Sequence, residues 1–82
     1  MIYFATFFSH FGAMRYALAC REAGIVSRTM PVPRDLSSSC GTCVRCEDRW
    51  LMPDAQTADE IERIVSFSDG QYTAVYCPKT ED

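Results

Sequence analysis

The sequence predicts a two-layer α+β fold in which two helices cover one face of a four-stranded antiparallel sheet. The chain has 82 residues, of which 48% are hydrophobic and 23% are charged. This length and composition are typical of one globular domain with one core, and the chain is too short for two. Apolar segments with strand spacing and with helix spacing alternate along it. We therefore expect a single domain over residues 1–82.

The first two predicted elements are a central strand and a helix. Residues 1–8 are aromatic and β-branched on both alternating faces, which is typical of a strand covered on both sides. Ser9 follows as an N-cap, because its hydroxyl can accept a hydrogen bond from the first free amides of a helix. Phe11, Met14 and Leu18 recur at i, i+3 and i+7, so they predict the buried face of that helix.

The rest of the chain predicts three strands and a second helix. Residues 25–32 alternate apolar and polar side chains and end at prolines, which indicates an edge strand. Residues 42–50 predict a third strand with fewer core-seeking side chains. Residues 57–60 match a capping box, and residues 61–68 continue with apolar side chains at helical spacing, so a second helix is expected there. Residues 71–77 have the composition of a last strand.

Elements in the order βαββαβ form a ferredoxin-like sandwich, in which the strand order is 4-1-3-2. The first two strands run parallel in this topology, so the start of the first helix and the loop of residues 33–41 share one end of the sheet. His10 and Cys40 should then be neighbours. Cys20, late in the helix, and Cys77, at the end of the last strand, are expected at the opposite end as structural residues.

Composition and charge argue against several classes of function. The formal net charge is −3 and the arginines are scattered singly, so no basic stripe marks a nucleic-acid interface. No apolar run reaches the roughly 18 residues of a membrane span, and the first residues lack the features of a signal peptide, so we expect a cytoplasmic protein without a membrane partner. No carboxylate pair, Ser/His/Asp set or phosphate loop supports a self-contained enzyme. Five cysteines, an odd number, favour reduced thiols with a chemical role.

The candidate for that role is Cys40, which lies in a loop rich in serine and glycine. Ser39 and Gly41 flank it, so the thiol should be accessible and the backbone free to adapt. The predicted topology brings the N-terminus of the first helix, Arg34 and His10 close to it. A helix terminus and nearby cations favour a thiolate, which is the nucleophilic form of cysteine. We therefore expect Cys40 to be a reactive thiol.

The segments that surround this cysteine resemble a known family. Residues 7–17, residues 22–25 and the string of residues 31–41 (PVPRDLSSSCG) are similar to the small bacterial family of selenium/sulfur carrier-like proteins. The similarity is concentrated in the first half of the chain. It implies a cysteine that accepts sulfur or selenium as a persulfide or selenopersulfide, and that cysteine maps to Cys40. This chain departs from the family pattern at the two later cysteines of the motif.

These two later cysteines leave alternatives open. Cys40 and Cys43 could form a pair in which the second thiol releases sulfur from the first. Cys40, Cys43 and Cys46 also match the opening of an iron-sulfur or zinc motif, for which Cys77 would be the fourth ligand. Two cysteines that are three residues apart on a strand point to opposite faces, which argues against this metal site.

The interpretation we prefer is a thiol-based carrier without catalytic turnover of its own and without a resident cofactor. Its partners would be a cysteine desulfurase-like donor and a protein that accepts the sulfur or selenium. The alternatives are the iron-sulfur or zinc module and a small interaction domain. Aromatic side chains in excess of what two short helices can cover also predict an open sheet face and a homodimer through it. These side chains are Phe4, Phe7, Phe8, Trp50, Tyr72 and Tyr76.

Overall fold

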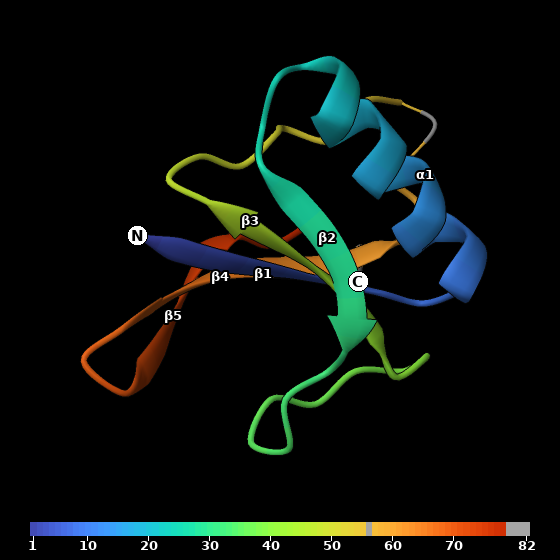
Figure 1. Cartoon of the computed structure of the whole chain (residues 1–82). Coiled ribbons are helices and arrows are strands. Elements are labelled where there is room, and N and C mark those ends of the chain that lie inside the picture. The colour runs from blue at the N-terminus through green and yellow to red at the C-terminus, as the bar shows by residue number, and fades with distance from the viewer. Residues whose placement is uncertain (56, 79–82) are drawn as a thin grey trace.

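The computed structural model describes residues 1–55 and 57–78 and contains one helix and five strands in those residues (Figure 1). The strands form one antiparallel sheet in the order β2-β3-β1-β4-β5. The helix crosses one face of this sheet. The elements are β1 (Ile2–Phe7), α1 (His10–Glu22), β2 (Ser27–Pro31), β3 (Thr42–Glu47), β4 (Ile61–Ser68) and β5 (Gln71–Tyr76).

The predicted α+β class is confirmed, but the two-helix ferredoxin-like fold is wrong. Strands β1 to β4 keep the predicted order 4-1-3-2, and β2 lies at an edge as expected. The fourth strand, however, is Ile61–Ser68, where the sequence predicts a helix. The predicted last strand is β5, which is added outside β4 as a hairpin. The sheet therefore has one strand more, and the fold one helix fewer, than predicted.

A β-bulge explains why residues 61–68 resemble a helix. Along β1, Thr6 pairs with Arg63 and the next residue, Phe7, pairs with Ile61, so one residue of β4 is extra. In a regular strand, Ile61 and Ile64 would point to opposite faces because they are three residues apart. The bulge turns both toward the core on the α1 side, where both are fully buried. Their spacing therefore imitates helical periodicity.

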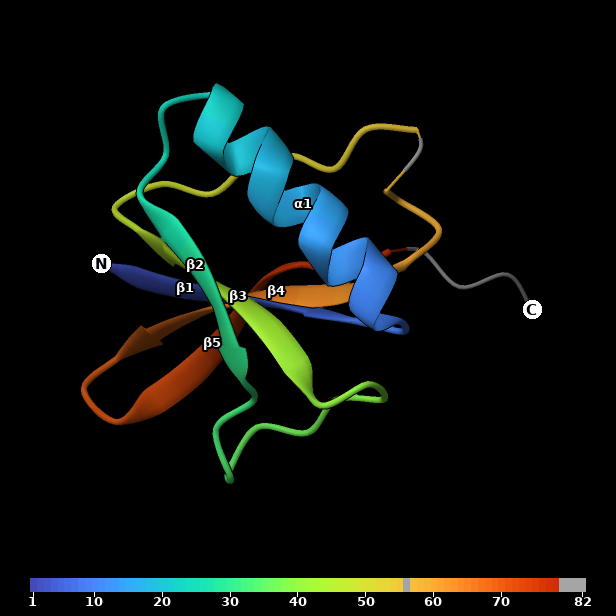
Figure 2. The same cartoon turned by 45° about the vertical axis from the view of Figure 1, so that its right-hand side comes forward.

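The segment between β3 and β4 occupies the place of the missing second helix. It crosses the same face of the sheet as α1 (Figure 2). The Tyr16 hydroxyl accepts a hydrogen bond from the Leu51 amide at 2.9 Å and donates one to the Leu51 carbonyl. Trp50 packs against the core beside Leu51, and its ring centroid lies 6.1 Å from that of Tyr76. An irregular segment thus closes the core on this side.

Helix α1 is rotated relative to the prediction. Its buried face contains small residues and one tyrosine, while the large apolar side chains of the predicted face point to solvent. The predicted face is therefore wrong. The exposed fractions are 62% for Phe11, 51% for Met14 and 54% for Leu18.

The small residues of α1 explain this rotation. Ala13, Tyr16 and Cys20 are also spaced i, i+3 and i+7, so the sequence contains a second face with the same periodicity. Small side chains allow the helix to approach the sheet closely. A Cβ atom on Gly12 would lie 2.6 Å from Oε1 and 2.8 Å from Cβ of Glu60. Close packing therefore favours burial of the helix face that has the small residues Gly12 and Ala13 in its first turn.

The other face of the sheet is partly covered by the loop between β2 and β3. Leu36 of this loop is buried against Phe4. The Tyr72 hydroxyl donates a hydrogen bond to Asp35 Oδ1 at 2.8 Å, which ties the loop to β5. Phe67 packs on Phe4 and Tyr72 with ring centroids 6.3 and 4.9 Å away. Part of the aromatic surface predicted to be open is thus packed within the chain.

Among residues 1–55 and 57–78, no helix has the length and apolar character needed to cross a membrane.

Candidate functional site

Cys40 lies at the end of the sheet where β1 finishes and α1 begins. Its thiol is half-buried, packs against the core on the α1 side and donates to the Thr42 carbonyl at 3.4 Å. His10 is the first residue of α1, and its Nδ1 lies 3.2 Å from Thr42 Oγ1. His10 and Cys40 therefore share this end of the sheet as expected, and each hydrogen-bonds Thr42 rather than the other. Thr42, which sequence reasoning did not single out, connects the two residues.

Gly41 sets the backbone direction that follows the cysteine. Its φ is +76°, a left-handed conformation that costs other residues energy. A Cβ at this position would meet nothing within 4 Å, so the requirement for glycine is conformational and not steric. The Gly41 carbonyl accepts a hydrogen bond from the Val32 amide at 3.0 Å, which closes the base of the loop.

The three serines before Cys40 fix the loop to neighbouring strands. This corrects the expectation of a freely adaptable backbone, because Glu62 and Arg63 of β4 both hold the loop. Sequence reasoning assigned Glu62 and Arg63 to a helix and so missed them. The one signal that could have found them is that three consecutive serines in an ordered loop require partners. The contacts are Arg63 Nη2 to the Ser37 carbonyl at 3.0 Å, Ser38 Oγ to the Phe7 carbonyl at 3.3 Å, and the Ser39 amide to Glu62 Oε1 at 3.2 Å.

Replacing Glu62 with alanine should loosen the loop without unfolding the protein. The carboxylate accepts hydrogen bonds from both the amide and the hydroxyl of Ser39. Losing them should cost about 1.4 kcal/mol locally, which is about a tenfold faster amide hydrogen exchange at Ser39 and Cys40. Glu47→Ala is the matched control, because Glu47 contacts Arg45 on β3 and not the loop. Equal exchange in Glu62→Ala and Glu47→Ala would contradict the tether.

Arg34 lies in the same loop but does not contact the thiol. It is exposed within a turn closed by the Leu36 amide and the Pro33 carbonyl at 3.0 Å. It makes no hydrogen bond or ion pair with another described residue. Within residues 1–55 and 57–78, therefore, no contact supports the expected stabilisation of the Cys40 thiolate by Arg34.

Cys43 and Cys46 point to opposite faces of the sheet. Cys46 is buried on the α1 side, where its sulfur lies 3.9 Å from that of Cys20. Cys43 is buried on the other side, beside Leu36. Within the described part of the chain, no group of three or more His, Cys, Asp or Glu residues could hold a metal ion. The structure does not bring together the cysteines of the iron-sulfur or zinc alternative.

Cys77 is exposed and follows β5. The prediction that it lies at the end of the sheet opposite Cys40 is wrong. Ile64 pairs with Ala5 on one side and with Tyr76 on the other, so β5 runs parallel to β1. The chain therefore leaves β5 at the same end as Cys40 but at the other edge of the sheet. Cys20 lies at the opposite end as expected, because its neighbour Cys46 pairs near the start of β1.

Burial makes the two later cysteines of the motif poor nucleophiles. Burial, with a smaller contribution from Cys40, raises the pKa of the Cys43 thiol to about 11. The hydrogen bond with Cys20 and then burial raise the pKa of Cys46. Both thiols should therefore stay protonated at neutral pH. Neither has the exposure or the ionisation that a resolving thiol for Cys40 requires.

Comparison with known protein families identifies the chain. The family model described as "Putative Se/S carrier protein-like" matches residues 2–77. The chain belongs to this family. The match to the Se/S carrier-like family extends from β1 to the end of β5 and so includes both halves of the molecule. No curated protein and no solved structure shows significant similarity to the chain.

Proposed function

We propose that the protein carries sulfur or selenium as a persulfide or selenopersulfide on Cys40. The observation that supports this role most strongly is the position of the Cys40 thiol. It is partly accessible in a tethered loop, whereas Cys20, Cys43 and Cys46 are buried. Beside this loop, a shallow depression of about 310 Å³ reaches Gly41 and offers room for a donor group. Membership of the Se/S carrier-like family supplies the class of cargo.

The transfer step needs no external oxidant or reductant. The Cys40 thiolate attacks the terminal sulfur of a donor persulfide, so a new S–S bond forms at Cys40 Sγ. The S–S bond of the donor breaks, and its electron pair leaves with the donor thiolate, which takes up a proton. The same displacement at a terminal selenium gives a selenopersulfide. A second protein thiol then removes the cargo by the same type of step.

The surrounding residues have positioning roles in this proposal. Gly41 and Ser39 hold the cysteine loop in one conformation, and His10 fixes Thr42, whose carbonyl accepts the thiol hydrogen bond. The donor would be a cysteine desulfurase-like enzyme, and the acceptor a protein that uses the cargo. Neither role needs catalytic turnover by this chain.

The test is loading of the reduced protein by a cysteine desulfurase and cysteine, followed by mass spectrometry. The wild type should gain the mass of one sulfur atom at Cys40. Cys40→Ser should lose all of this gain, because the buried thiols cannot reach the donor and Cys77 lies at the other edge of the sheet, away from the depression. Cys77→Ser is the matched control and should load fully, since Cys77 is the other cysteine of the five that is not buried.

Site assignment requires fragment ions, since residues 35–45 form one tryptic peptide that contains both Cys40 and Cys43. Sulfur found on Cys43 or Cys77 in the wild type would contradict the assignment of the acceptor. Loading that persists in Cys40→Ser would contradict the proposed function.

A further inference from the structure

The exposed face of α1 carries a continuous apolar stripe. Phe11, Met14 and Leu18 follow one another at i, i+3 and i+7, and Arg21 takes the next position of the same row at i+10. This is the spacing of the seam by which one helix packs along another. The stripe is about 15 Å long, which matches three turns of a facing helix. More than half of the area of each apolar side chain in it is exposed.

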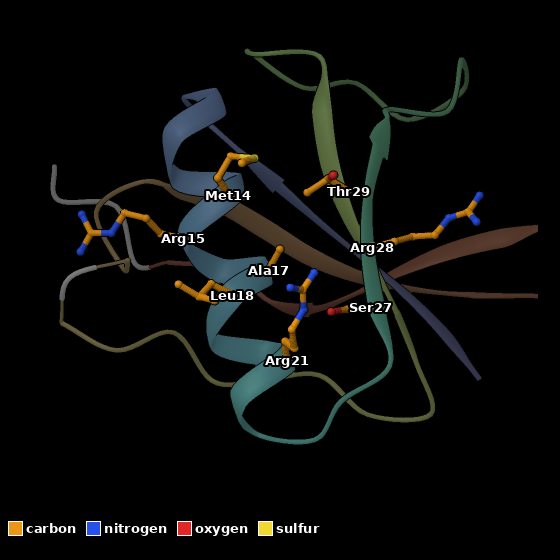
Figure 3. Close-up of a pocket in the computed structure, with 8 residues that line it drawn as sticks. All are labelled: Met14, Arg15, Ala17, Leu18, Arg21, Ser27, Arg28 and Thr29. Carbon is orange, nitrogen blue, oxygen red and sulfur yellow. The ribbon is translucent and has the colours of Figure 1, made fainter.

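A groove of about 470 Å³ lies between this stripe and β2. In Figure 3, Ala17 from α1 and Ser27 and Thr29 from β2 point into it, and Arg21 extends into it from the last turn of the helix. The groove thus combines an apolar wall with polar groups at its floor and one end. The residues that line it are Met14, Arg15, Ala17, Leu18, Arg21, Ser27, Arg28 and Thr29.

The charge of this groove has one sign. Three of its lining residues are arginines and none is acidic. The Arg15 guanidinium stacks over the Phe11 ring at 5.3 Å and lies 3.9 Å from Glu60 Oε2. In Figure 3, Arg28 extends from β2 away from the groove, whereas Arg21 reaches into it. The Arg21 guanidinium makes no hydrogen bond or ion pair with any residue of the described ranges, so this cation is available to a partner.

We infer that the groove between α1 and β2 binds an acidic amphipathic helix of a partner protein. The apolar residues of that helix would pack on Met14 and Leu18, and its carboxylates would face Arg21, which reaches into the groove. A second copy of this chain fits less well. Its own α1 would bring further arginines to the groove, and like charges that face each other across an interface are unfavourable.

The groove leads toward the reactive cysteine. Thr29 lines both the groove and the depression that reaches Gly41 and Thr42. A helix docked along α1 would therefore lie beside the loop of Cys40. This inference rests on the proposed function in one respect: the docked partner is taken to be the protein that delivers the cargo or removes it.

Two synthetic helical peptides of about three heptads test the charge requirement. Both have leucine at the a and d positions, with glutamate at the flanking positions in one and lysine in the other. We expect the glutamate peptide to bind, the lysine peptide not to bind, and affinity to fall with added salt. Arg21→Glu should weaken binding at least about tenfold, and Leu18→Asp should do the same. Equal binding of both peptides would overturn the inference.

Arg34→Glu is the matched control, because Arg34 is also exposed and without a partner in the described residues but lies outside the groove. It should leave peptide binding unchanged, and an equal loss in this variant would overturn the inference. A concentration-dependent dimer of the wild type that Leu18→Asp abolishes would show that a second copy occupies the groove, and so would also overturn it.

Loading rates separate this inference from the proposed function. The Arg21→Glu variant should load about tenfold more slowly from a desulfurase, but at the wild-type rate from a small persulfide such as glutathione persulfide. An equal fall with both donors would overturn docking at the groove. Cys40→Ser should still bind the glutamate peptide. If the Cys40→Ser variant binds the glutamate peptide while the wild type cannot be loaded, the proposed function is wrong, but docking at the groove is still supported.

Discussion

Phe7→Ala should destabilise the protein by about 3–5 kcal/mol, because it removes a large side chain from the centre of the core. Phe7 is fully buried at the end of β1, and its ring centroid lies 5.4 Å from that of Tyr16. Small domains have only about 5–15 kcal/mol of stability in total, so a substantial fraction of the variant should be unfolded at 37 °C. Urea unfolding at constant protein concentration measures the effect.

The neighbouring residue provides the matched control. Phe8 is 58% exposed, and its alanine variant removes the same atoms from the adjacent position in the chain. Phe8→Ala should change the free energy of unfolding by about 0.5 kcal/mol or less. If both variants lose similar stability, the orientation of the end of β1 is wrong, and the placement of the Cys40 loop beside it is wrong as well.

Tyr16→Phe should cost about 1–3 kcal/mol, because the hydroxyl satisfies both the amide and the carbonyl of Leu51. Burial raises the pKa of Tyr16, so the hydroxyl keeps its proton and can donate to the carbonyl. The variant should also loosen the segment between β3 and β4. Trp50 is the single tryptophan of the chain, and its emission should shift to the red in the folded variant.

Tyr3→Phe is the control for this substitution, since the Tyr3 side chain packs against the same core but its hydroxyl makes no hydrogen bond with a described residue. Its stability should stay within about 0.5 kcal/mol of the wild type. If Tyr16→Phe leaves both the stability and the Trp50 emission unchanged, the segment between β3 and β4 does not take the place of a second helix on this face of the sheet.

The strands and the helix of the first half could be predicted because local patterns determine them. Ser9 caps α1 as expected, and its hydroxyl accepts from the Gly12 amide at 3.0 Å. The second helix was predicted wrongly because a bulge gives Ile61 and Ile64 the spacing of a helix, and bulges depend on the pairing partner. Local spacing could not show that the strand pairs with β1, which lies far away in the sequence.

The site could be predicted only as far as the topology was right. His10 and Cys40 share an end of the sheet because β1, α1, β2 and β3 have the expected order. The contact of Glu62 with the loop was missed because it depends on β4. Cys77 was placed at the wrong end of the sheet because its position depends on β5. The face of α1 was ambiguous in the sequence, because two sets of residues have the same periodicity. Packing against Glu60 decides between them.

The central place of β1 has a consequence for how the chain folds as it is made. β1 is synthesised before the other strands, yet its two partners are β3 and β4, and Ile2 pairs with both Glu47 and Phe67. No β-pairing of β1 can form until these later segments have been synthesised, and such non-local pairing is slow. Until then the nascent chain displays an unpaired strand with aromatic side chains on it. This interval is when aggregation or capture by a chaperone competes most strongly with folding.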